Sequence, residues 1–246
     1  MPKYTDAINR APLSRVRSYP DATDADRDMI VRMPNAVWML LLAAAPIVAQ
    51  DGVKFDTPEV RVIEAVNTPG QRSALHKHDV NRVMIYLDDG HMELTDPQGN
   101  VENVRWKAGD VRWSPAGGPH TSANVGSTTY RIIEVELKNG PGAMPENPLD
   151  PVRVDPERYK VEFENPQVRV LRARYGPRET GVLHEHILNR VIVLLAGQDM
   201  RVTTPDGKVA TVRGMAGDVT MGGRAKHQEQ NQSLLPFEVV VVELKR

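Results

Sequence analysis

Three histidines occur twice in this chain at matching spacings, and side chains of this type can bind a metal ion. The first set is His76, His78 and His120, and the second set is His184, His186 and His227. The two sets lie 107 or 108 positions apart, and neighbouring residues repeat with them. A duplicated fold explains a repeat of apolar positions, but it does not by itself require three histidines in each copy. The repeat therefore points to chemistry as well as to architecture.

The spacing of the first two histidines in each set suits a shared metal. Residues two apart on a strand point to the same face, so His76 and His78 can reach one ion, which His120 would join from a later strand. Three neutral imidazoles leave coordination positions open, as a catalytic metal requires. The chain has no cysteine, so the ligands must be nitrogen and oxygen atoms. Fe, Mn, Ni, Cu and Zn all fit, and ligand preference does not choose among them. The alternative for each set is a relic triad or buried, hydrogen-bonded histidines.

The sequence around the histidines is typical of short strands. Segments such as 60–66, 83–87 and 130–137 are rich in β-branched and apolar residues, and several alternate apolar with polar residues. Turn-forming clusters, including 96–99 and 115–119, separate these segments. No convincing helical stretch follows residue 53. The sequence therefore predicts an all-β protein.

The second half of the chain repeats the plan of the first. Val168-Arg-Val-Leu171 matches Val60-Arg-Val-Ile63, and similar matches continue to the end of the chain. The predicted domains are residues 50–140 and 157–246, because the proline-rich segment 141–156 reads as a stiff, extended connector. Two units of this size with many short strands favour small barrels or sandwiches.

The motifs around the histidines resemble those of cupins, and the chain as a whole resembles a bicupin, in which two cupin domains follow one another. The cupin motif G-x5-P-x-G-x2-H-x3-N is matched at every position by Gly109, Pro115, Gly117, His120 and Asn124. Gly70 with His76 and His78 matches the opening of the other cupin motif. The second copy keeps Gly217, His227 and Asn231, but it lacks the proline and is one residue shorter in that turn. The resemblance implies two tandem cupin-type barrels of the double-stranded β-helix, or jelly-roll, class. It also implies a possible homodimer.

One departure from the cupin pattern changes the chemistry that we expect. Arg82 and Arg190 stand where the family has a metal-binding glutamate, and an arginine cannot ligate a metal. A unit positive charge about 6 Å from a divalent ion costs roughly 5 kcal/mol at an effective dielectric constant of about 20. We hypothesise that an inward Arg82 binds a substrate carboxylate beside a three-histidine metal, an arrangement similar to that of thiol dioxygenases. The alternative is that the arginines form structural salt bridges, for example to Glu134, Glu136 or Glu243.

Glu229 is a further candidate ligand-binding residue. It lies two positions after His227, so on a strand it can face inward and supply the missing carboxylate or pair with Arg190. The alternative is a glutamate that faces solvent. Asn124 and Asn231 are interpreted as residues that brace a turn.

The first 49 residues are expected to lie outside the fold. Ala36 to Ala49 is an apolar run, Arg32 precedes it, and polar residues follow at Gln50. This order resembles a signal peptide, although an unusual polar segment lies upstream. The run is too short to span a bilayer comfortably, so we expect no stable membrane span after cleavage. We therefore predict a secreted or periplasmic protein. The alternative is a buried or amphipathic N-terminal helix.

Composition excludes one class of partner and leaves two classes of function. The formal net charge of -1 and the low aromatic content of 5% argue against a nucleic-acid surface. The remaining functions are a dioxygenase-like or other metalloenzyme that acts on a small carboxylate or oxygen-rich molecule, and a metal-free protein that binds a sugar or carboxylate without catalysis.

Overall fold

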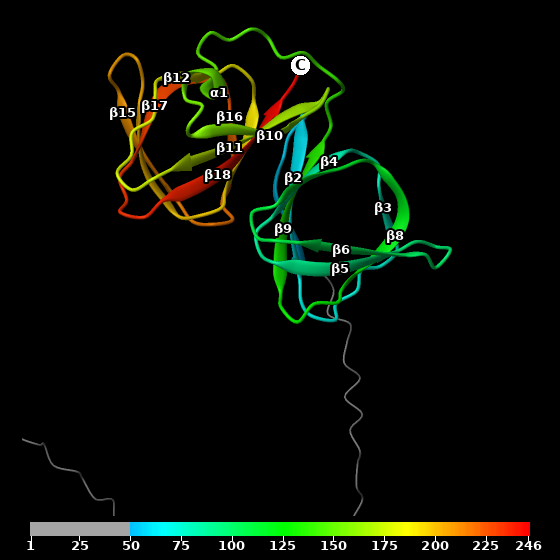
Figure 1. The fold of residues 1–246 in the computed structure, drawn as a ribbon. Coiled ribbons are helices and arrows are strands. Elements are labelled where there is room, and N and C mark those ends of the chain that lie inside the picture. Colours follow the sequence, from blue (N-terminus) through cyan, green and yellow to red (C-terminus); the bar gives the residue numbers. More distant parts are fainter. Residues whose placement is uncertain (1–49) are drawn as a thin grey trace, which may run out of the picture. The chain divides into compact units, whose positions relative to one another are not determined.

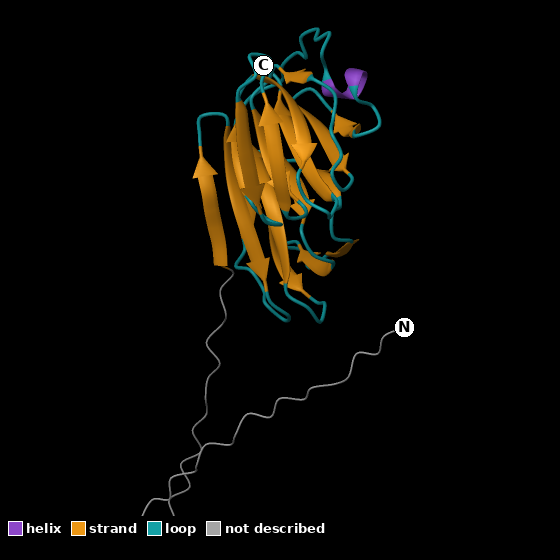
Figure 2. Ribbon diagram, turned by 90° about the vertical axis from the view of Figure 1, so that its left-hand side faces the viewer, coloured by secondary structure: helices purple, strands orange, loops and turns teal. Residues whose placement is uncertain are grey.

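A computed structural model describes residues 50–246, and these residues form antiparallel strands almost throughout (Figures 1 and 2). The predicted signal peptide lies outside the described residues. The strands of the N-terminal half are β1 (Gln50–Asp56), β2 (Val60–Asn67), β3 (His76–His78), β4 (Arg82–Tyr86), β5 (Gly90–Thr95), β6 (Val101–Trp106), β7 (Val111–Ser114), β8 (Gly117–Asn124) and β9 (Tyr130–Leu137). Those of the C-terminal half are β10 (Tyr159–Glu164), β11 (Val168–Tyr175), β12 (His184–His186), β13 (Arg190–Leu194), β14 (Gln198–Thr203), β15 (Val209–Gly214), β16 (Val219–Gly222), β17 (Ala225–Asn231) and β18 (Phe237–Leu244).

Each half forms one five-stranded and one four-stranded sheet. The five-stranded sheets have the orders β1-β2-β9-β4-β7 and β10-β11-β18-β13-β16, and the four-stranded sheets have the orders β3-β8-β5-β6 and β12-β17-β14-β15. Within residues 50–246, no strand of one half pairs with a strand of the other. The order is the same in both halves, so the predicted fold of two tandem jelly-roll barrels is confirmed. Figure 1 shows the strands of each half wrapped around an interior of their own.

Two local expectations differ from the structure. The connector contains a short helix, α1 (Pro151–Val154), which Asp150 caps by accepting a hydrogen bond from the Val152 amide. Proline at the first helical position favours this turn, so the connector is not extended throughout. The second difference is that β8 already begins at Gly117, inside the segment predicted to be a turn, because Gly117 pairs with His78. Among the described residues, no helix is long and apolar enough to span a bilayer.

Both faces of strands β4 and β13 are buried or nearly so, and this decides which of their side chains enter each barrel. Val83 and Ile85 of β4 join Val191 and Val193 of β13 in one hydrophobic core that the two halves share. The intervening residues of these strands, such as Met84, pack inside their own barrel. Because side chains alternate along a strand, the residues at positions 82 and 190 face the barrel interiors.

The two halves also contact each other through hydrogen bonds that repeat the internal symmetry. Asn81 Nδ2 donates to Gln167 Oε1 over 2.6 Å, and Asn189 Nδ2 donates to Glu59 Oε2 over 2.6 Å. Asn81 and Asn189 are equivalent in the repeat, and so are Glu59 and Gln167. Polar contacts and the shared core therefore join the barrels into one compact unit.

The shared core predicts that the two barrels unfold together. Val83→Ala removes two methyl groups from a fully buried position, and we expect it to lower the free energy of unfolding by about 2 kcal/mol. Val101→Ala, at an exposed position of β6, is the control and should change it by less than about 0.5 kcal/mol. Calorimetry should show a single transition for each protein. Two separate transitions, with only one of them shifted by Val83→Ala, would contradict a shared core.

Candidate metal centres

The second histidine set converges inside the C-terminal barrel. His184 and His186 lie on β12, His227 lies on β17, and these strands pair so that His184 is opposite His227. One possible ligand atom from each residue lies within 4.8 Å of the others. All three side chains are buried. The structure therefore brings together the three histidines that the sequence singled out in this copy.

Hydrogen bonds at Nδ1 fix the tautomer of two of these rings, so that Nε2 carries the lone pair. His184 Nδ1 donates to the Val182 carbonyl over 2.9 Å, and His186 Nδ1 donates to Glu243 Oε1 over 2.9 Å. A carbonyl or carboxylate oxygen only accepts here, so the proton lies on Nδ1 and the lone pair on Nε2. Burial is the main cause that lowers the pKa of His186 to about 4, and the nearby Arg190 adds to it. This imidazole is therefore neutral at pH 7, as a metal ligand must be.

A buried carboxylate adjoins the triad. Glu229 Oε1 lies 3.2 Å from His227 Nε2, while Oε2 accepts hydrogen bonds from the hydroxyls of Tyr159 over 2.8 Å and Tyr175 over 3.0 Å. Burial opposes ionisation of Glu229, but the neighbouring His227, His184 and Tyr159 outweigh it, and its pKa lies below the ordinary range. Glu229 thus faces inward as a carboxylate, and the solvent-facing alternative is wrong.

The atoms at the centre of this cluster fit a cation. His227 Nε2 is buried and forms no hydrogen bond with the described residues, although Glu229 Oε1 lies 3.2 Å from it. Tyr159 has one hydroxyl proton, yet its oxygen lies near both Glu229 Oε2 and, at 3.2 Å, His184 Nε2. At least one of these two acceptors is left without that proton. Lone pairs that converge without donors are the arrangement that a metal satisfies.

Arg190 faces the same interior without a carboxylate partner. Its Nη1 donates to the Gly223 carbonyl, and among residues 52–246 no Asp or Glu oxygen lies within ion-pair distance of its guanidinium. The salt bridge from Arg190 that the sequence offered as an alternative is therefore absent from these residues. Burial lowers the pKa of Arg190, but an arginine stays charged at physiological pH. A cavity of about 520 Å³ is lined by Arg190, His186, His227 and Glu229, together with mostly apolar side chains.

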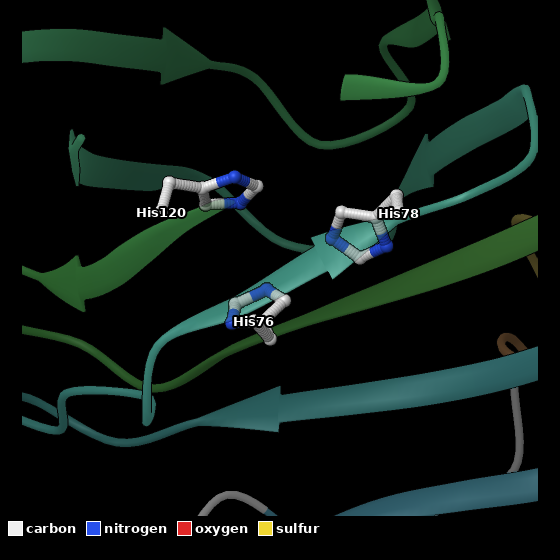
Figure 3. Close-up of side chains that lie close together, drawn as sticks. All are labelled: His76, His78 and His120. Carbon is white, nitrogen blue, oxygen red and sulfur yellow. The ribbon is translucent and has the colours of Figure 1, made fainter. Parts of the chain in front are cut away.

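The first histidine set converges in the N-terminal barrel, and Figure 3 shows its three rings pointing toward one another. His76 and His78 lie on β3 and His120 on β8, with one possible ligand atom from each within 4.8 Å of the others. His76 Nδ1 donates to the Ala74 carbonyl and His120 Nδ1 to the Gly118 carbonyl. These rings are half-buried, whereas those of the C-terminal set are buried.

Arg82 enters the N-terminal barrel and contacts the triad directly. Its Nη1 donates to His78 Nε2 over 2.8 Å and to Glu134 Oε2 over 2.7 Å, and its Nη2 donates to Ser114 Oγ over 3.0 Å. Burial, followed by the charge of Arg82, lowers the pKa of His78 to about 3. The salt bridge to Glu134 that the sequence offered as an alternative is therefore present. The role of Arg82 as a substrate anchor stays a prediction.

The two motif asparagines brace equivalent loops, as expected. Asn124 Nδ2 donates to the Asn67 and Thr128 carbonyls, and Asn231 Nδ2 donates to the Gly176 and Leu235 carbonyls. The motif glycines Gly109 and Gly217 adopt φ values of 87° and 91°, which glycine accepts without a steric cost.

Sequence reasoning missed Tyr159 and Tyr175, which lie beside Glu229. Their equivalents in the first copy are Asp51 and Asn67, so an aligned comparison of the two copies could have marked them as residues particular to the second barrel. It also missed the role of Glu243, which was considered a partner for arginine but accepts a hydrogen bond from His186.

Comparisons with known proteins agree with this geometry. No family model matches the chain. The β-alanine degradation protein BauB from Pseudomonas aeruginosa is 30% identical over 86 residues, which are 35% of this chain and 90% of that protein. Solved structures with the same fold include a cupin 2 conserved barrel domain protein from Leptotrichia buccalis (TM-score 0.51, 12% identity), of which 93% is covered along with 83% of this chain. The chain has the cupin fold.

Other structures cover both barrels of this cupin at once. Oxalate decarboxylase from Bacillus subtilis matches with a TM-score of 0.55 and 15% identity, over 80% of this chain and 72% of that one. AerE from Microcystis aeruginosa matches with a TM-score of 0.56 and 12% identity, over 81% and 98%. At these identities the likeness concerns the fold alone. Coverage of about four fifths of this chain fits a bicupin.

The lowered histidine pKa values predict a loss of stability in mild acid. An unfolded chain protonates its histidines near pH 6.5, whereas folded His78 and His186 resist protonation until about pH 3 and 4. The unfolded state therefore binds more protons below pH 6.5, and the free energy of unfolding falls as pH decreases from 7 to 5. Urea unfolding with a chelator present should show this fall. The variant His186→Gln should show a shallower fall between the same two pH values, and an equal or steeper one would contradict the assignment.

Proposed function

We propose that this bicupin is an enzyme whose C-terminal barrel binds a divalent transition metal on His184, His186 and His227, and that its substrate is a small carboxylate. The observation that carries the proposal is the convergence of the three buried histidines beside Glu229, with a His227 Nε2 that forms no hydrogen bond with the described residues, at the wall of a cavity that Arg190 also lines. Glu229 supplies a negative charge beside the triad and lowers the cost of bringing a dication there.

The cavity indicates what kind of molecule fits. Arg190 is a buried cation with no carboxylate within ion-pair distance among residues 52–246, so an anionic ligand can accept a charge-assisted hydrogen bond from it. Ile192, Leu194, Met200 and Phe237 line the same space and suit an aliphatic group. A monocarboxylate with a short apolar chain satisfies both features. The volume of about 520 Å³ is in the range of small-molecule sites.

The residues around the cavity have separate roles in this proposal. Arg190 donates to the substrate carboxylate and fixes its position, and the apolar wall excludes water from the rest of the molecule. Tyr159 and Tyr175 hold Glu229 in place through its Oε2, which keeps Oε1 directed toward His227. Glu243 holds His186 in the tautomer that presents Nε2. A divalent metal bound here would supply Lewis acidity, polarising an oxygen atom of the substrate.

The names of related proteins support a small carboxylate. One relative is described as a β-alanine degradation protein, and oxalate decarboxylase shares the two-barrel fold and is described as having Mn(II) centres. A dioxygenase-like reaction is the finer hypothesis for this chain. It requires that the functional metal be redox-active and that the loss of substrate be matched by consumption of O2 in equal amount. A homodimer also stays a prediction.

The assignment of Arg190 predicts a separation of ligand binding from metal binding. Arg190→Gln should weaken binding of butyrate or hexanoate by roughly 10- to 100-fold, because one charged hydrogen bond contributes about 1.5–3 kcal/mol. The same variant should keep its metal, since Arg190 contacts no histidine of the triad. His186→Ala should lose the metal. Calorimetric titration with each acid and elemental analysis of the purified proteins provide these values.

Arg201→Gln is the matched control, because Arg201 lies on β14 of the same barrel but is exposed. It should change neither quantity. Full affinity for the acids in Arg190→Gln would refute the anchoring role, whereas metal retained in His186→Ala would refute the metal site. Oxalate and β-alanine belong in the same titrations, to compare the substrates that the relatives' names mention.

We also propose that the protein is exported, on the basis of the apolar run at 36–49 that follows Arg32. Expression of the full chain in a bacterium should then place a shortened protein in the periplasmic fraction, with a new N-terminus close to Gln50. N-terminal sequencing of that fraction gives the cleavage site. An intact chain confined to the cytoplasmic fraction would exclude export.

A further inference from the structure

Two arginines that are equivalent in the repeat, Arg82 and Arg190, have different hydrogen-bond partners in the two barrels. In the N-terminal barrel Arg82 contacts a triad histidine, whereas in the C-terminal barrel the equivalent Arg190 is bonded to the Gly223 carbonyl. We propose that the Arg82 guanidinium takes the place of the metal in the N-terminal barrel, so that the chain binds metal in the C-terminal barrel alone. This inference rests on the proposed metal site of the C-terminal barrel.

The positions of the protons at His78 show why the N-terminal triad does not fit a metal as it stands. A guanidinium only donates, so His78 Nε2 must use its lone pair to accept from Arg82. A neutral imidazole then carries its proton on Nδ1. Neither nitrogen of His78 retains a lone pair for a metal. His76 and His120 alone do not make the three-ligand set that a cupin-type metal site requires.

The residues that turn Arg82 toward His78 are particular to the first copy. Glu134 and Ser114 both accept hydrogen bonds from its guanidinium. Their equivalents in the second copy are Val241 and Gly222, neither of which has a side-chain acceptor. A side chain at Gly222 would approach Arg190 Cζ to 3.1 Å, so glycine leaves room for the position that Arg190 adopts when it donates to the Gly223 carbonyl. The difference between the two arginines is therefore built into the sequence.

A second difference concerns the anionic ligand. The residue equivalent to Glu229 in the first copy is Ser122, so the N-terminal triad has no carboxylate in that position. The nearest counterpart is Glu134, whose charge is already balanced by Arg82 over 2.7 Å. Glu134 is thus neutralised by a guanidinium in the first barrel, whereas Glu229 in the second barrel forms no ion pair with an arginine of residues 52–246 and remains available to a dication.

Zinc stoichiometry of the full chain tests the proposal, because zinc binds imidazole and carboxylate ligands without redox chemistry. The protein is loaded with Zn²⁺, dialysed and analysed for metal and protein content. We expect about one zinc per chain in the unaltered protein and about two in Arg82→Gln, which frees His78 and leaves Glu134 as an additional oxygen ligand. Arg82→Lys keeps a cation beside Glu134 and should stay at about one. Arg190→Gln is the matched control in the other copy and should also stay at about one.

A second variant keeps the test informative if Arg82→Gln does not fold. Glu134→Val with Ser114→Gly transfers the residues of the second barrel into the first and should release Arg82 from His78, raising zinc to about two per chain. Thermal unfolding establishes that each variant is folded before its zinc content is compared.

The outcomes separate this inference from the proposed function. About two zinc ions in the unaltered protein would overturn the inference and leave the C-terminal site intact. No zinc in the unaltered protein but about one in Arg82→Gln would support the replacement of a metal by Arg82 in the N-terminal barrel, but it would refute the proposed C-terminal metal. No gain of zinc in either folded N-terminal variant would overturn the inference.

Discussion

Burial of both faces of β4 and β13 is the constraint on which the candidate sites depend. One face of each strand joins the core shared by the two barrels, and the other lines the interior of its own barrel. A strand fixed in this way cannot slip by one residue without moving polar side chains into the shared core. Arg82 and Arg190, the first residues of these strands, are therefore held inside the barrels beside the histidines. The chemistry of each barrel then depends on which groups accept hydrogen bonds from the guanidinium.

The duplication supplied two copies of one scaffold, and a few substitutions made them different. The strand order that presents the histidines is the same in each half, and His76 is opposite His120 as His184 is opposite His227; of these two pairings, only that of β3 with β8 contains a register shift. The difference lies in side chains that enter the interior from neighbouring strands. Tyr159 and Glu229 surround the C-terminal triad with a buried carboxylate network, whereas Glu134 pairs with Arg82 in the other barrel. A common fold thus presents three histidines beside a buried carboxylate in one barrel and beside a fixed internal cation in the other.

Much of the architecture could be predicted from the sequence, because its signals are local. The alternation in segments such as 130–137 and the motif that ends at Asn124 determine strands and turns over short distances, and both agree with β8 and β9. The convergence of the histidines followed from spacing and resemblance. The direction of Arg82 and the burial of Glu229 could not be derived in the same way. They depend on partners more than 50 residues away in the sequence, such as Glu134 for Arg82 and Tyr159 for Glu229.

The central claim is that the C-terminal barrel binds the metal through its buried histidines. Anomalous diffraction from crystals of the full chain grown with Zn²⁺, recorded on both sides of the zinc absorption edge, tests this most directly. The account predicts one anomalous peak per chain, within coordination distance of the Nε2 atoms of His184, His186 and His227. A peak between His76, His78 and His120, with none in the C-terminal barrel, would contradict it.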